Sequence, residues 1–147
     1  MLMKRFIQFI LITVMVAGAS WVFWQDYTSG PGVDHRLVKY VNEWKQDMDS
    51  AGISYNRIFN LRLDTIEVVG GLNAYGYCYT NHIEISEGIL GSEWVTRQAV
   101  YHELGHHVLS LDHVDDKCIM FEKSLGEDFC RDNWNSLVSK YINRAKE

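Results

Sequence analysis

The spacing of apolar residues predicts three amphipathic helices in the larger, C-terminal part of the chain. Apolar side chains recur at intervals of three and four residues in segments 34–51, 93–111 and 132–145, as they do on the buried face of a helix. Asp34 is a suitable cap for the first helix, and Gly52 marks its end. Each helix is therefore expected to bury one face in a shared core.

Between the first two helices the pattern changes to one that is typical of strands. Short apolar stretches bounded by glycine or asparagine cover residues 61–69, 75–80 and 83–85. The chain is therefore expected to fold as an α+β domain. A small mixed sheet would be combined with a backing helix, a central helix and a C-terminal helix.

The N-terminal residues are expected to direct export rather than to join the fold. Lys4 and Arg5 precede an apolar run at 6–24, so the remainder of the chain is predicted to lie outside the cytoplasm. The run is long enough to be an uncleaved membrane anchor, which we favour. The alternative is a signal peptide cut after Ala19, which ends an Ala-x-Ala sequence and would give a secreted or periplasmic protein.

Length and charge limit the remaining possibilities. The chain has 147 residues, which suits a single domain at 34–147 after an anchor or signal segment at 1–25 and a linker at 26–33. The net charge of −5 gives no basic surface, so a nucleic-acid partner is not expected. The sequence does not indicate an oligomeric state.

The central helix carries the candidate chemistry. His102 and His106 are four residues apart, so both imidazoles lie on one helix face and can bind one metal ion. Glu103 lies at the flank of that face, where its carboxylate can contact a water molecule beside the metal. This HExxH arrangement is that of zinc hydrolases, in which the glutamate acts as base and then as acid.

Residues 102–120 resemble the metzincin clan of zinc peptidases, in which HExxHxxGxxH or HExxHxxGxxD is followed by a turn that contains methionine. The resemblance implies one Zn²⁺, Glu103 as general acid/base, and Met120 as an apolar floor below the metal. It also implies a metzincin-like α+β fold and hydrolysis of a peptide bond in a peptide or protein substrate. The edge strand of such a domain binds the substrate in extended form, which makes Tyr77 and Tyr79 candidates for the substrate rim.

The third metal ligand is open between two neighbouring residues. Leu109 stands where the clan has glycine, and the clan's spacing places the ligand at Asp112, one residue before His113. The chain is also similar to small bacterial proteins in which HELGH precedes a later histidine, and this similarity favours His113. His113 can reach the metal only if the helix ends near Ser110 or Leu111.

Two further histidines and three cysteines are expected to stay outside the metal site. His107 points about 100° away from His106 and is interpreted as structural or exposed. His82 falls in a predicted turn and is interpreted as exposed. In an exported protein, one disulfide and one free thiol are the simplest outcome for the set Cys78, Cys118 and Cys130.

Two other functions remain compatible with the sequence. A non-catalytic, zinc-containing binding or structural module of the cell envelope would keep the metal but have no turnover. A non-metal envelope protein would depend mainly on its membrane segment. The presence of Glu103 favours an enzyme over the first alternative, because a structural metal site does not require a base.

Overall fold

The computed structural model describes residues 30–147. The hydrophobic run at 6–24, with its alternatives of anchor and signal peptide, lies outside the described residues. Among the residues that are described, no helix combines the length and apolar character needed to cross a membrane.

A four-stranded mixed sheet is formed by β1 (Gly32–Val33), β2 (Thr65–Val69), β3 (Gly76–Cys78) and β4 (His82–Ser86). The strand order is β1-β2-β4-β3. The first three strands in this order are parallel, and β3 pairs antiparallel with β4 at the edge of the sheet. The predicted α+β class and the mixed sheet are therefore confirmed.

The sheet buries one face and leaves the other open. Ile66, Ile83 and Ile85 are fully buried on the inner face, because alternate side chains of a strand point to opposite sides. Glu67 and Glu84 alternate with them and lie on the outer face. The central helix, α4, which spans Glu93–Leu109, packs on the inner face.

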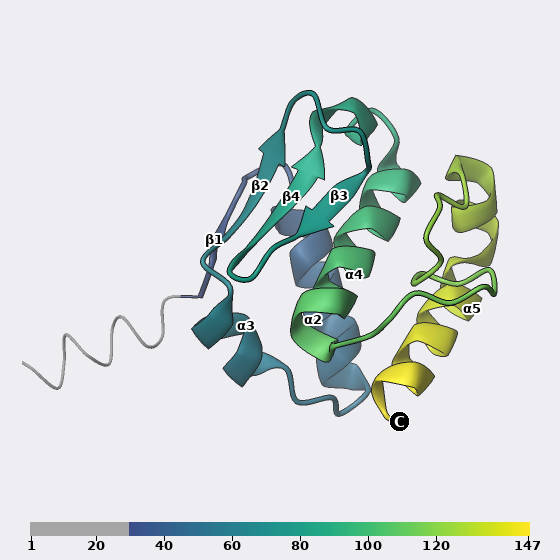
Figure 1. Ribbon diagram of the computed structural model, residues 1–147. Coiled ribbons are helices and arrows are strands. Elements are labelled where there is room, and N and C mark those ends of the chain that lie inside the picture. The colour runs from purple at the N-terminus through teal and green to yellow at the C-terminus, as the bar shows by residue number, and fades with distance from the viewer. Residues whose placement is uncertain (1–29) are drawn as a thin grey trace, which may run out of the picture. The chain divides into compact units, whose positions relative to one another are not determined.

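Helix α4 (Glu93–Leu109) occupies the centre of the domain, between the sheet and α5 (Glu127–Ala145) (Figure 1). It contacts β3, β4, α5 and also α2 (Val38–Ser50), so the sheet and two helices together fix its position. The short elements α3 (Asn56–Arg62) and η1 (Glu87–Ile89) complete the fold.

Three expectations for the secondary structure need correction. The predicted strand at 61–69 is confirmed only from Thr65 onward, because α3 occupies Asn56–Arg62 and buries Phe59 against the ring of Trp44, 6.1 Å away. Helix α2 begins at Val38 rather than at Asp34, since Asp34 caps a preceding turn. Helix α5 begins at Glu127, five residues before the predicted start at 132.

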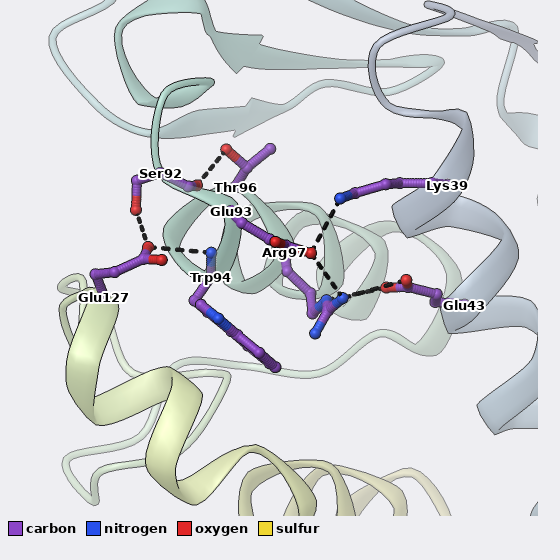
Figure 2. Close-up of polar contacts among 8 residues, drawn as sticks. All are labelled: Lys39, Glu43, Ser92, Glu93, Trp94, Thr96, Arg97 and Glu127. Carbon is purple, nitrogen blue, oxygen red and sulfur yellow. Dashed lines mark hydrogen bonds and ion pairs between the residues drawn. The ribbon is translucent and has the colours of Figure 1, made fainter.

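The beginning of α4 is held by a carboxylate from α5 (Figure 2). Glu127 accepts hydrogen bonds from the hydroxyl of Ser92 and from the backbone N–H of Trp94, the latter at 3.1 Å. A negative charge is favourable there because the first N–H groups of a helix lack partners within the helix. Helix α5 thus fixes the end of α4 that is distant from the histidines.

A second set of contacts joins α4 to α2 (Figure 2). The half-buried Arg97 forms an ion pair with Glu43 at 2.9 Å, and Glu93 accepts a hydrogen bond from Lys39 at 3.0 Å. The guanidinium of Arg97 also lies 4.2 Å from the ring of Trp94. These interactions restrict rotation of α4 about its axis, which determines where its histidines point.

A buried chain of hydrogen bonds connects the three long helices. The indole N–H of Trp44 donates to the hydroxyl of Tyr141 at 3.0 Å, and that hydroxyl donates to the carbonyl of Tyr101 at 2.9 Å. All three side chains are almost completely inaccessible to water. Tyr101 directly precedes His102, so this chain fixes the backbone at the site.

Candidate metal centre

The end of α4 returns the chain toward its own histidines. The helix ends at Leu109, and Ser110 adopts left-handed angles of φ 55° and ψ 36°. The backbone N–H of Leu111 then donates to the carbonyl of Gly105 at 3.0 Å, which closes the turn. Leu109, which replaces the glycine of the clan pattern, stays helical, and the left-handed residue comes one position later.

This later turn brings His113, not Asp112, to the other two histidines. The Nε2 atoms of His102, His106 and His113 form a triangle in which each pair is 3.0 Å apart. A point about 2.1 Å from all three, the usual zinc–imidazole distance, lies about 1.2 Å out of their plane. The three side chains can therefore hold one metal ion.

Backbone carbonyls orient two of the three rings. The Nδ1 of His102 lies 2.8 Å from the carbonyl oxygen of Ile119, and the Nδ1 of His106 lies 2.6 Å from that of Leu111. A carbonyl only accepts hydrogen bonds, so each Nδ1 carries the proton and each Nε2 presents a lone pair. Two lone pairs that face each other at 3.0 Å are favourable only when a cation lies between them.

Burial also keeps the triad in the form that binds metals. Loss of hydration is the main cause that lowers the pKa of His102 to about 4; the hydrogen bond to the carbonyl of Ile119 acts against this shift, and the nearby His106 and His113 add to it. Burial likewise lowers the pKa of His106. Both imidazoles are therefore neutral near neutral pH, as ligation requires.

Glu103 is a buried carboxyl group that faces the same cleft. Its side chain is only 7 % exposed, and burial alone raises its pKa to about 7. Gly76 of β3 makes this position possible, because a Cβ atom there would lie 2.8 Å from Cγ of Glu103. Glu103 can thus exchange a proton near neutral pH.

Met120, the predicted floor residue, packs against α4 at Gly105. It is completely buried, and a Cβ atom on Gly105 would lie 2.6 Å from its sulfur. Gly105 stands between His102 and His106 in the helix, so the absence of a side chain there lets Met120 approach the backbone. Ile119, whose carbonyl orients His102, is the residue before Met120.

An open cleft of about 480 Å³ gives access to the triad and to Glu103. One wall is segment 74–78, which includes β3, the floor includes Ala99 and Val95 of α4, and the other wall is segment 121–124. Buried Gln98 holds that second wall, since its carboxamide oxygen accepts from the N–H of Leu125 at 3.1 Å. The cleft is wide enough for part of an organic substrate to lie beside the metal-binding atoms.

Other sequence-predicted residues take different places. Tyr77 lines the cleft, whereas Tyr79 stacks on His82 with ring centroids 4.4 Å apart. Asp112 is exposed and lies outside the triad. His107 Nδ1 lies 3.2 Å from the carbonyl oxygen of Tyr79, which connects α4 to the end of β3.

The expected disulfide is not formed. Cys78, Cys118 and Cys130 are all free, and each lies in a different environment. Cys130 is buried on α5 next to Gln98, while Cys78 lies in the cleft wall, 3.5 Å from Nδ1 of His107.

Several contributors to the site were not found from the sequence. Gly76 and Gln98 lie outside the motif at 102–120, and the orienting carbonyls of Leu111 and Ile119 are backbone groups within it that its side-chain pattern does not specify. The glycine between two tyrosines in a predicted strand was the one available signal, because such a glycine often marks a close approach of backbone to another group.

Comparisons of the chain with models of protein families, with curated proteins and with solved structures gave no match in any of the three. The site is therefore described by its own geometry: an α+β domain with a histidine triad that can bind a metal ion.

Proposed function

We propose that this chain is a zinc-dependent endopeptidase that hydrolyses peptide bonds with Glu103 as general acid/base. The observation that carries the proposal is the single cleft onto which the three Nε2 atoms and the Glu103 carboxyl group all open. Three imidazoles with a carboxylate beside them are the protein groups that zinc hydrolases use.

The chemistry follows from what each group can do. Zinc held by the triad would act as a Lewis acid that lowers the pKa of water to near 7. Glu103, which lines the same cleft as the triad, would accept a proton from the water as the water oxygen bonds to the peptide carbonyl carbon. Glu103 would then give this proton to the amine nitrogen as the C–N bond breaks, which restores the carboxylate.

The openness of the site favours catalysis over a structural role. Structural zinc sites are usually closed by four protein ligands, whereas catalytic sites have three and leave one position accessible. The triad supplies three ligands, and the adjacent cleft supplies the access. A non-catalytic zinc module, the alternative considered from the sequence, would not need this opening.

A peptide in extended conformation is the substrate form that suits the cleft. Strand β3 is at the edge of the sheet, and Gly76 places its backbone close to Glu103. An extended peptide can pair with such an edge as an additional strand, with Tyr77 at the rim. Backbone pairing gives affinity with little demand on the substrate's side chains.

We further propose that the domain acts outside the cytoplasm. The support is the sequence of the first 25 residues, with a basic start and a long apolar run. The N-terminal segment would anchor the chain in the membrane, or would release it if cleaved after Ala19. The mass of the mature N-terminus, measured on chain purified from membranes and from the medium, separates these outcomes.

Glu103→Gln is the decisive variant for the enzyme proposal. We expect its zinc content to equal that of the wild type, and its kcat on a quenched fluorescent peptide library to fall by at least about 100-fold, the usual contribution of a general base. Glu122→Gln, which removes an exposed carboxylate from the same cleft, should retain activity. Equal activity of the Glu103 variant and the wild type would exclude the proposed mechanism.

A further inference from the structure

A second group of metal-ligating side chains lies on the open face of the sheet. Glu67 of β2 and both His82 and Glu84 of β4 point away from α4 and the histidine triad. One ligand atom from each residue lies within 4.8 Å of the ligand atoms of the other two. This group belongs to no part of the cleft described above.

The two carboxylates are placed where they repel each other. Glu67 and Glu84 are direct partners in the register of β2 and β4. Like charges that face each other across neighbouring strands destabilise a sheet. Within residues 30–147, no lysine or arginine forms an ion pair with either of them.

The orientation of His82 is determined from outside the group. Asn81 donates from its amide nitrogen to a carboxylate oxygen of Asp64 at 2.6 Å, so its amide oxygen is free to accept. That oxygen lies 3.3 Å from Nδ1 of His82, which places the proton of the neutral ring on Nδ1. Stacking on Tyr79, with ring planes 9° apart, fixes the ring further.

In this orientation a lone pair of His82 faces a negative charge. Its Nε2 atom lies 3.6 Å from Oε1 of Glu84, so the lone pair of the neutral ring faces the carboxylate, an arrangement that a cation between them would stabilise. A hydrogen bond that fixes the ring through the opposite nitrogen is the usual arrangement of a metal-ligating histidine. The tautomer of His82 and the two facing carboxylates would thus both be stabilised by a cation bound among the three side chains.

We propose that Glu67, His82 and Glu84 bind a second divalent cation of the first-row transition-metal series. One imidazole and two carboxylates form a ligand set that Zn²⁺ and Mn²⁺ both accept. A charge of +2 neutralises the two facing carboxylates, which makes the cation a stabiliser of the sheet. Water completes its coordination on the open face, so this site binds more weakly than the partly buried triad.

The test measures zinc binding by the full-length chain in detergent, after treatment with a chelator. The double variant His106→Ala/His113→Ala removes the triad, and we expect it still to bind about one equivalent of Zn²⁺ in calorimetric titration, with a rise in the thermal unfolding temperature. Adding Glu67→Gln, which preserves side-chain shape, should weaken this binding at least tenfold. His82→Ala should have the same effect, whereas His35→Ala, which removes a fully exposed histidine, should have none.

Two results would overturn the proposal. One is a double variant that is folded by circular dichroism and binds neither Zn²⁺ nor Mn²⁺ in titration. The other is a ¹⁵N NMR spectrum in which both ring nitrogens of His82 carry protons near neutral pH, because an imidazolium would then neutralise the carboxylates without a metal. The double variant lacks the triad, so these results do not depend on peptidase activity.

Discussion

Replacing Glu103 by glutamine should make the metal-free protein more stable at alkaline pH although it removes the proposed catalytic base. The carboxyl group is 7 % exposed, and burial is the sole cause that raises its pKa from 4.5 to about 7. A carboxyl whose pKa is higher in the folded state lowers stability as pH rises through that range. Glutamine has nearly the same shape and carries no charge.

The size of the effect follows from the pKa shift. A shift from 4.5 to about 7 corresponds to about 3 kcal/mol of unfolding free energy, since each pKa unit is worth about 1.4 kcal/mol. The ionised carboxylate lowers the unfolding free energy by this full amount above the folded-state pKa, and it has no effect below the unfolded-state pKa. About 2.5 kcal/mol of it should therefore develop between about pH 5 and about pH 9.

Urea denaturation of the chelator-treated chain, followed by tryptophan fluorescence, measures this difference. Buried Trp44 makes the signal sensitive to unfolding of the core. The gain in stability from Glu103→Gln should be about 2.5 kcal/mol larger at about pH 9 than at about pH 5, so any pH-independent cost of the amide cancels. Glu122→Gln, on the exposed part of the cleft, should change stability by less than about 0.5 kcal/mol at either pH. A gain that is equal at both pH values would show that the Glu103 carboxylate is not desolvated.

Three further substitutions test other parts of the account. His113→Ala should lose zinc on dialysis while Asp112→Ala retains it, as measured by elemental analysis. Zinc retained by His113→Ala and lost by Asp112→Ala would instead make Asp112 the ligand. Gly76→Ala should lower kcat more than tenfold with zinc content unchanged, because its methyl group would displace Glu103. Gly91→Ala, which has open space around it, should not lower kcat. Equal activities of the two variants would show that the position of Glu103 does not depend on its contact with β3. Ser110→Gly should stabilise the protein by about 0.5–1 kcal/mol in urea denaturation, since glycine adopts the left-handed angles without strain, and a destabilised variant would contradict the described end of α4.

The local parts of the site were predictable because they depend on helix geometry alone. His102 and His106 share a face of α4 whatever surrounds the helix, and the apolar spacing that defined the helix is independent of the sheet. The sequence could not decide between Asp112 and His113, because that choice depends on one backbone angle at Ser110. The non-local contact between Gly76 and Glu103 was equally inaccessible to a pattern of spacing.

The errors in the fold arise where tertiary packing outweighs local preference. Leu61 and Arg62 end α3 although Leu61 was predicted to start a strand, since the helix places Phe59 against Trp44 in the core. The expected disulfide followed from the number of cysteines in an exported chain, yet the distances between elements, not the count, determine whether thiols can meet. Tyr79, a candidate for the substrate rim from its place in the tyrosine-rich segment 75–79, lies just after β3 and stacks on His82, a contact that the spacing did not reveal.

The central claim is that three imidazole nitrogens hold one zinc ion beside Glu103. Anomalous diffraction at the zinc edge, from crystals of the chain loaded with one equivalent of Zn²⁺, locates the ion without any assumption about activity. The account predicts one dominant peak about 2.0–2.1 Å from the Nε2 atoms of His102, His106 and His113. A dominant peak at any other group of side chains, or no peak at the triad, would contradict it.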